Sequence, residues 1–462
     1  MFDVQSPYSG EVIGQVPFAD RNHVEQALQT AYALFKDQDR WLAVHERVTI
    51  LDRAAEIMQS RRDELALQAA AEGGKPLIDS RVEVNRAIDG VRLAAETIRS
   101  EAGHVIPMAS TAAGAGRIAF TQKQPIGVVV AVSAFNHPLN LIVHQVAAAI
   151  AAGCPVLVKP AQDTPLSCLS FVEILHQAGL EPDWCQFVLP LDNDITQQMV
   201  TDARVGFFSF IGSARVGWML KSKLAPGTRC ELELGGVAPL IVAADADLDR
   251  AIPAILKGGF YHAGQVCVSV QRVFAHRSIA EALTARLAEG AEALIVGDPT
   301  EADTEVGPLI REAEVDRVDD WVQQAAQAGA EIRSGGRRLG NQCYAPTVLF
   351  NPPDDAEISQ KEVFGPVLAV YPFDELDQAI ERSNQLSFAF QAAVFSQDID
   401  TALRVTQRIN ASAVMVNDHT AFRVDNMPFA GLNQSGYGIG GIGYTIEDMQ
   451  IEKMTVIRSS EL

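Results

Sequence analysis

Residues 127–159 read GVVVAVSAFNHPLNLIVHQVAAAIAAGCPVLVK. Valine-rich runs of strand length stand at both ends, at 127–132 and 155–159, and the segment from about Leu139 to Gly153 has the length of a helix. Strands that are apolar throughout are buried on both faces, which is typical of a parallel sheet covered by helices. The stretch therefore predicts a β–α–β unit of an α/β fold.

The same alternation continues on both sides of this unit. Towards the C-terminus we expect further strands at 187–189, 205–211, 239–243, 270–274, 363–371 and 392–395, and helices at 166–177, 195–201, 214–224, 248–263 and 279–294. The N-terminal part is predicted to be mostly helical, with helices at 21–34 after an N-cap at Asp20, at 45–71 and at 78–101. This order predicts an α/β architecture with more than one sheet, in which parallel strands are covered by helices on both faces.

Two segments have the alternating polar and apolar pattern of exposed strands. They lie at 115–124 and 453–457. Exposed strands of this kind usually need a partner strand or a partner subunit. We therefore expect a small β element that serves oligomerisation.

The composition bounds the class of protein. The chain has 462 residues, of which 48% are hydrophobic and 21% charged, and a formal net charge of −21. Phosphate binding needs a basic surface, so this charge argues against a nucleic-acid partner. No secretory signal is visible at the N-terminus, and polar side chains interrupt the apolar stretch at 127–159. We expect a soluble, cytoplasmic protein that does not insert in a membrane.

The cysteines are dispersed along the chain. There are six, at positions 154, 168, 185, 230, 267 and 343, and no pair has the CxxC spacing. This pattern indicates free thiols in a reducing compartment. No HExxH motif or Asp-rich loop is present either, so no metal site is expected.

Two short motifs carry the chemistry. LELGG at 232–236 contains Glu233, and GQVC at 264–267 ends on Cys267. A lone cysteine is more often an inert buried thiol, and a lone glutamate is more often a solvated carboxylate. Together they fit the oxidation of an aldehyde, in which a thiolate attacks the carbonyl carbon and a carboxylate later activates water.

With these motifs in place, the chain resembles the aldehyde dehydrogenase superfamily over nearly its whole length, most closely the lactaldehyde and phosphonoacetaldehyde dehydrogenase branch. The motifs that carry the resemblance occur in the family's order: QPIGVV at 124–129, FNHP at 135–138, VKP at 158–160, FIGS at 210–213 with Gly217, ELGG at 233–236, GQVC at 264–267, EVFGP at 362–366 and PFAG at 428–431.

The resemblance implies roles for three catalytic residues. Cys267 matches the nucleophile, and Asn136 matches the amide that forms an oxyanion hole with the backbone N–H of Cys267. Glu233 matches the general base of hydrolysis, which favours a free carboxylic acid as the product. A CoA-acylating aldehyde dehydrogenase and a non-catalytic dinucleotide-binding protein of the same fold remain as alternatives.

The resemblance also implies a nicotinamide cofactor. The positions that match its binding residues are Lys159, Gln162, Gly212, Ser213, Glu362 and Phe364. Many NAD-preferring members carry a glutamate at the position of Gln162, where it repels a 2′-phosphate. Because Gln162 is neutral, we expect NAD or NADP, with NAD favoured.

The substrate pocket is expected to include residues near 417–423. Arg423 lies in this segment, and His137 adjoins Asn136 in sequence. Together they could form a cationic pocket for an aldehyde that carries a carboxylate or phosphonate.

The architecture that the resemblance implies has three parts. Residues 1–110 and 127–234 are expected to form a Rossmann-like domain that binds NAD(P), and residues 235–425 to form an α/β catalytic domain. Residues 111–126 and 445–462 are expected to form the oligomerisation element of a homodimer or homotetramer.

Overall fold

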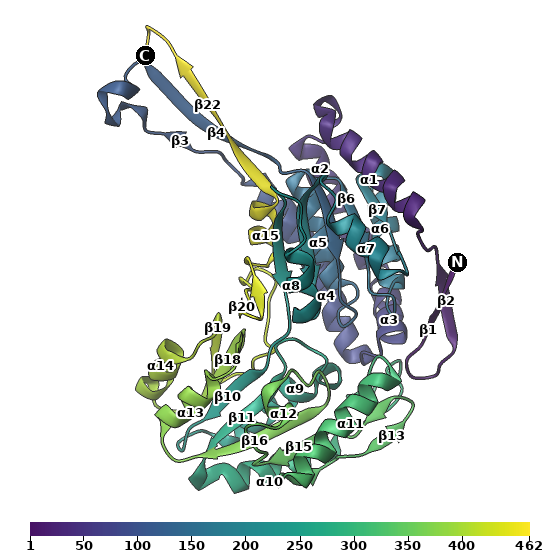
Figure 1. The fold of residues 1–462 in the computed structure, drawn as a ribbon, viewed down its shortest axis with the longest axis vertical. Coiled ribbons are helices and arrows are strands. Elements are labelled where there is room, and N and C mark those ends of the chain that lie inside the picture. The colour runs from purple at the N-terminus through teal and green to yellow at the C-terminus, as the bar shows by residue number, and fades with distance from the viewer.

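Two sheets with helices on both faces form the body of the chain, and a long β arm projects from it (Figure 1). The computed structural model describes all residues 1–462. The first sheet has the order β21-β9-β8-β5-β6-β7. Its strands are β21 (Gly436–Tyr437), β9 (Arg229–Glu233), β8 (Val205–Ile211), β5 (Val128–Val132), β6 (Val156–Lys159) and β7 (Cys185–Phe187). All of them run parallel except β21, which confirms the α/β prediction from residues 127–159.

Alternation along β5 divides the first core into two layers. Val129 and Ala131 pack in one cluster with helices α2 (Val44–Ser60), α3 (Arg62–Gly73), α4 (Leu77–Arg99), α5 (Asn140–Ala152), α6 (Leu166–Gln177) and α15 (Ile442–Asp448). Val128, Val130 and Val132 pack in another with α1 (Arg21–Lys36), α7 (Asn193–Val200) and α8 (Ala214–Lys221). Side chains two apart on a strand share a face, so one valine-rich strand serves both layers.

Some predicted boundaries were wrong. The helix predicted at 45–71 is two helices, because Arg61 leaves helical geometry at φ −107° and ψ 15°. Asp63 and Glu64 then stand in the first turn of α3, where carboxylates favour a helix N-terminus. The strand predicted at 187–189 is β7, two residues earlier. By contrast α5 ends as predicted, at Gly153 with φ 83°.

The second sheet has the order β12-β15-β16-β11-β10-β18-β19. Its strands are β12 (Glu331–Ser334), β15 (Thr347–Phe350), β16 (Val367–Phe373), β11 (Val270–His276), β10 (Ala238–Val242), β18 (Gln391–Phe395) and β19 (Ala413–Val416). Only β12 is antiparallel to its neighbour. One face is covered by α9 (Leu248–Phe260), α10 (Arg277–Ala293) and α11 (Glu312–Gln327), and the other by α13 (Leu376–Ser383) and α14 (Ile399–Arg408).

Short elements complete the chain. Three two-stranded pairs join β1 (Phe2–Gln5) to β2 (Val12–Val16), β13 (Arg338–Gly340) to β14 (Cys343–Tyr344), and β17 (Phe388–Ala389) to β20 (Leu432–Asn433). A short helix, α12 (Glu357–Gln360), precedes β16. None of the helices has the length and apolar character needed to cross a membrane.

The arm consists of three antiparallel strands. β22 (Gln450–Arg458) pairs along its whole length with β4 (Arg117–Pro125), and β3 (Val105–Ile106) pairs with β4. Residues 108–114 form short 3₁₀ turns. Several apolar side chains of the arm are exposed, among them Val105, Ile118, Met454, Val456 and Ile457. A ribbon of this kind has little core of its own.

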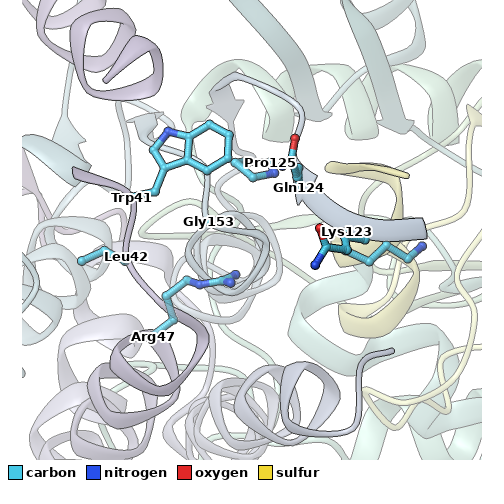
Figure 2. A pocket seen from close by; sticks show the side chains of 8 residues that line it. Trp41, Leu42, Arg47, Lys123, Gln124, Pro125 and Gly153 are labelled. Carbon is cyan, nitrogen blue, oxygen red and sulfur yellow. The ribbon is translucent and has the colours of Figure 1, made fainter. Parts of the chain in front are cut away.

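A cavity of about 240 Å³ lies where the arm joins the first unit (Figure 2). It is lined by Trp41, Leu42, Arg47, residues 122–125 and Gly153. None of the predicted site residues lines this cavity, so it is not the candidate active site.

Candidate active site

The carboxyl edge of the first sheet carries several of the predicted site residues. Lys159 and Glu233 are the last residues of β6 and β9, while Asn136 and Ser213 follow β5 and β8. Parallel strands end at the same edge, so these side chains come together. The strand order reverses between β5 and β8, the position at which doubly wound sheets bind ligands.

The amino edge of the second sheet faces this carboxyl edge. Cys267 lies in the turn before β11, and Glu362 lies in the loop before β16. Asn136 bridges the two edges, because its Nδ2 donates a 2.9 Å hydrogen bond to the carbonyl of Gln265. Gly236 lies against the turn that carries Cys267, where an added Cβ would be 2.5 Å from the Cys267 carbonyl oxygen. The structure thus brings Asn136, Glu233, Cys267 and Glu362 to one junction.

The turn that carries Cys267 is strained and pinned. His262, Ala263 and Gly264 all have positive φ, at 48°, 53° and 70°. A Cβ at Gly264 would lie 2.1 Å from the Gly365 carbonyl oxygen, so only glycine fits there. The buried Gln265 side chain donates to the His262 and Pro308 carbonyls and accepts from the Ile310 N–H. Strain held in this way is typical of functional sites. This role of Gln265 was not predicted from the sequence, although the residue stands in the GQVC motif.

The charges around Cys267 act in opposite directions on its thiol. Burial raises the pKa of the Cys267 thiol well above its usual range, and the carboxylates of Glu362 and Glu233 raise it further. The guanidinium of Arg423 lowers this pKa. The thiol is therefore protonated at neutral pH and has to lose its proton before it can act as a nucleophile.

Glu233 has the properties of a general base for neutral pH. Its carboxyl is buried, and burial raises its pKa to about 7, against the lowering effects of Arg423 and of a hydrogen bond with Glu231. A base is most useful when its pKa lies near the working pH. Glu231 was not singled out from the sequence.

The loop before β16 holds Glu362 and Phe364. Glu362 Oε1 accepts a 3.0 Å hydrogen bond from the Gly236 N–H, and burial raises the pKa of Glu362 to about 7. Phe364 has φ 46°, a costly conformation for a bulky residue, and its ring meets Phe135 edge-on at 5.7 Å. The strand predicted at 363–371 begins only at Val367, because this loop occupies the first residues.

The four remaining cofactor positions form a cradle at the first sheet. Ser213 is the N-cap of α8, yet its side chain makes no capping hydrogen bond, so its hydroxyl is free for a ligand. A Cβ at Gly212 would lie 2.8 Å from the Phe210 ring. Lys159 is buried with its Nζ on the Pro160 carbonyl, and burial lowers its pKa to about 8. Gln162 donates to the Leu191 carbonyl. A free helix N-terminus beside a buried lysine fits an anionic dinucleotide.

His137 does not carry the positive charge that was predicted for it from the sequence. Burial lowers the pKa of His137 well below its usual value, and the cations of Lys75 and Arg86 lower it further. Its Nε2 lies 3.1 Å from the Tyr261 hydroxyl. The ring is therefore neutral at neutral pH, and the expected cationic pocket depends on Arg423 alone.

Arg423 is a cation without a hydrogen-bond partner. Its Nη1 and Nη2 atoms are buried and donate no hydrogen bond. The guanidinium lies over the Phe429 ring at 3.9 Å. Burial lowers the pKa of Arg423, whereas the charges of Glu233 and Cys267 raise it, so the guanidinium acts on both residues. Unsatisfied donors of this kind are suited to a ligand anion.

A buried polar network fixes the segment that carries Arg423. Asp425 accepts two hydrogen bonds from Arg86 on α4, at 3.0 and 2.8 Å, and one each from Asn140 and His144 on α5. These contacts hold the pKa of the Asp425 carboxyl far below its usual value, against the raising effect of burial. No local pattern in the sequence pairs Asp425 with residues so far upstream, and the network was not predicted.

Comparison with known proteins agrees with this geometry. The model of the aldehyde dehydrogenase family matches residues 1–455. A 3-sulfolactaldehyde dehydrogenase of Priestia aryabhattai is 37% identical, over 98% of this chain and 94% of the relative. A lactaldehyde dehydrogenase of Methanocaldococcus jannaschii is 34% identical, over 98% and 97%. The structure of glyceraldehyde-3-phosphate dehydrogenase GapN from the same organism, complexed with NADP, superimposes with a TM-score of 0.94 at 33% identity, over 99% of each chain. This chain belongs to the aldehyde dehydrogenase family.

Proposed function

We propose that this chain oxidises an aldehyde to the carboxylic acid with NAD or NADP, through a thioester on Cys267. The observation that carries the proposal is the junction of the two sheet edges, where Cys267, Asn136 and Glu233 converge from three distant parts of the chain. A nucleophile, an oxyanion donor and a base within one buried site form a set sufficient for acyl transfer and hydrolysis.

The first step is attack on the aldehyde. The Cys267 sulfur forms a bond to the carbonyl carbon, the C=O π bond breaks to give an oxyanion, and the thiol proton leaves to a water molecule. The developing oxyanion is stabilised by the backbone N–H of Cys267 and by Asn136. One N–H of the Asn136 amide is held by the Gln265 carbonyl, which leaves its second N–H for the oxyanion. Preorganised donors of this kind contribute about 3 kcal/mol each.

The residues of the cradle fit the cofactor. Lys159 and Gln162 would hold the adenosine ribose, Gly212 and Ser213 the pyrophosphate, and Glu362 and Phe364 the nicotinamide end. A bound nicotinamide would supply the hydride acceptor for the oxidation of the carbon attached to Cys267. The release of Glu362 from the Gly236 N–H would free its carboxylate for the ribose hydroxyls.

The last step is hydrolysis of the thioester. Glu233 accepts a proton from water, the water oxygen forms a bond to the acyl carbon, and the C–S bond breaks to return Cys267. Because Glu233 must be ionised to act, the rate of this step is expected to rise as the pH passes its pKa of about 7 and to level off above it. A base at this position supports a free acid rather than acyl-CoA as the product.

The substrate is an aldehyde with a second, anionic group. Arg423 supports this assignment, since its two buried guanidinium nitrogens lack partners and lie within electrostatic reach of Cys267. A carboxylate, sulfonate or phosphate on the aldehyde would satisfy both donors. His137 is neutral, with its Nε2 3.1 Å from the Tyr261 hydroxyl, and adds no charge to this assignment.

The test of the proposed function is formation of NAD(P)H from a panel of neutral, hydroxylated and acid-bearing aldehydes, with NAD and with NADP. Turnover of at least one aldehyde in the absence of CoA, with the carboxylic acid as the product, is the expected result. A protein that binds the dinucleotide but turns over none of the panel would contradict the proposal.

Arg423→Gln is expected to lower kcat/KM for acid-bearing aldehydes by about 100-fold more than for neutral aldehydes, because two charge-assisted hydrogen bonds are lost. Both classes share a further loss, since the guanidinium no longer lowers the pKa of the Cys267 thiol. The assays should be run at about pH 9, where Glu233 is ionised even without the nearby guanidinium. Arg404→Gln is the matched control, since it removes only a surface ion pair with Asp377. Equal losses for neutral and acidic aldehydes would refute the anion-binding role.

Gln162→Glu is expected to lower kcat/KM with NADP by about tenfold or more and to change that with NAD little, because a carboxylate would face the 2′-phosphate. The measured quantity is the NAD-to-NADP ratio of kcat/KM. Gln162→Ala removes the same hydrogen bond to Leu191 without adding charge and should not shift this ratio in the same way. An unchanged ratio in Gln162→Glu would show that residue 162 does not face the 2′-phosphate of the bound cofactor.

The three-part organisation of the chain belongs to the same proposal. Residues 1–110 and 127–234 bind the cofactor and residues 235–425 carry the nucleophile. The arm, with its exposed apolar side chains, joins subunits into a homodimer or homotetramer in the cytoplasm.

A further inference from the structure

A second buried carboxylate accompanies the proposed base. Glu231 lies two residues before Glu233 on β9, so both side chains point to the same face of the strand. Their exposed fractions are only 3% and 8%. An added Cβ at Gly440 would lie 2.0 Å from Glu233 Oε1 and 2.6 Å from Glu231 Oε1. The two Oε1 atoms therefore converge beside Gly440, where no side chain would fit.

Two carboxylates so close together in a buried site do not both ionise, because the repulsion is not screened by water. They share a proton instead. The proton resides on the carboxyl whose surroundings stabilise its ionised form less. The groups that face the two carboxyls decide which one that is.

The two carboxyls have different surroundings. The guanidinium of Arg423 acts on Glu233 and stabilises its ionised form, and the Cys267 thiol faces the same side. Glu231 faces no cation: the Thr445 hydroxyl and the Asp448 carboxylate, both on α15, lie on its side. Burial, together with the charge of Glu233, raises the pKa of Glu231 well above its usual range, while that of Glu233 stays at about 7. The proton therefore resides on Glu231.

The two oxygens of the Glu231 carboxyl have different neighbours. Thr445 Oγ1 donates a 3.1 Å hydrogen bond to Glu231 Oε2. A protonated carboxyl has one accepting carbonyl oxygen and one donating hydroxyl. Oε2 is engaged by Thr445, and Oε1 is the atom that converges with Glu233 Oε1 beside Gly440, so a proton shared by the two carboxyls lies at Glu231 Oε1.

We propose that Glu231 is a positioning residue that remains protonated during turnover and donates its Oε1–H to the Glu233 carboxylate, which orients this base and keeps it ionised at neutral pH. The inference rests on the proposed role of Glu233 in hydrolysis. Glu231 itself touches neither substrate nor cofactor.

The test compares Glu231→Gln with Glu231→Leu in pre-steady-state kinetics. The NAD(P)H burst reports the steps up to the thioester, and the linear phase at saturating substrate reports its hydrolysis when a burst is seen. Glu231→Gln keeps a hydrogen-bond donor. In the plot of the linear-phase rate against pH, its acid limb should therefore lie near that of the wild type. Glu231→Leu removes the donor, so the limb should move up by about one pH unit, with a hydrolysis rate about tenfold lower on its acid side and an unchanged burst.

The direction of the shift discriminates between the two locations of the proton. If Glu231 were the ionised member, both substitutions would remove a negative charge and move the acid limb downward. A downward shift in either variant would overturn the proposal, and so would identical limbs in wild type and Glu231→Leu.

A second readout does not depend on turnover. At about pH 8, well above the ordinary pKa of a glutamate, the infrared difference spectrum between wild type and Glu231→Gln should contain the carbonyl stretch of a protonated carboxylic acid in the wild type. Its absence would overturn the proposal even if Glu231→Leu fails to fold. If the wild type turns over no aldehyde, the proposed function fails on its own, and the infrared result still reports on Glu231.

Discussion

Cys267→Ala is expected to reduce aldehyde-dependent NAD(P)H formation by about 10⁴-fold or more, because no other group can form the covalent bond to the carbonyl carbon. The other five thiols cannot substitute for it. Four of them are buried, and Cys230 lies on β9 with its side chain on the face opposite to Glu231 and Glu233. The rate is measured from the absorbance of the reduced nicotinamide with the best aldehyde of the panel.

Two controls make this result specific. Cys230→Ala removes a half-buried thiol from the same part of the fold and should keep full activity. The Cys267→Ala protein should still bind the dinucleotide, since its cradle at the first sheet is untouched. Activity within about tenfold of wild type in Cys267→Ala would contradict covalent catalysis at this residue.

Glu233→Gln is expected to lower the steady-state rate by about 10²–10³-fold while the initial burst of NAD(P)H is kept, because the loss of a general base slows hydrolysis but not the earlier hydride step. The amide has the shape of the carboxylate and cannot accept a proton. Burial raises the pKa of Glu233 to about 7, so the rate of hydrolysis by the wild type should rise as the pH passes this value. The rate of the variant should not show this rise. Rapid-mixing absorbance measurements across this pH range separate burst from steady state.

This variant also separates the rival reactions. If CoA were the physiological acceptor, the wild type would turn over slowly without CoA and rapidly with it, and Glu233→Gln would keep its CoA-dependent rate. A burst that disappears in Glu233→Gln, rather than surviving, would mean that Glu233 acts before the thioester forms.

The sequence predicts the parts of the fold that local patterns control. The Val-rich runs at 128–132 and 156–158 are buried strands, and Gly153 ends the helix between them with a positive φ. Lys159 was predicted to end a strand and is the last residue of β6, at the carboxyl edge where such sheets bind ligands. The strand that ends on Glu233, β9, was not predicted. The motif order then indicated the family to which the chain belongs.

Contacts between distant segments could not be predicted in the same way. The hydrogen bond from Asn136 to Gln265 joins two sheets, and the network around Asp425 joins α4 and α5 to a loop near the C-terminus. The neutrality of His137 arises from burial and nearby cations, neither of which is visible from the residue type. Glu231 gave a weak signal that was overlooked: a second glutamate at strand spacing from the first.

The most direct test of covalent catalysis at Cys267 is the mass of the Cys267 peptide after the Glu233→Gln protein is mixed with substrate and cofactor and quenched in acid. We expect this peptide to gain the mass of the acyl group in place of the thiol hydrogen, only when aldehyde and NAD(P) are both present, and at the rate of the burst. An unmodified Cys267 peptide during a burst, or an acyl group on another cysteine, would contradict covalent catalysis at Cys267.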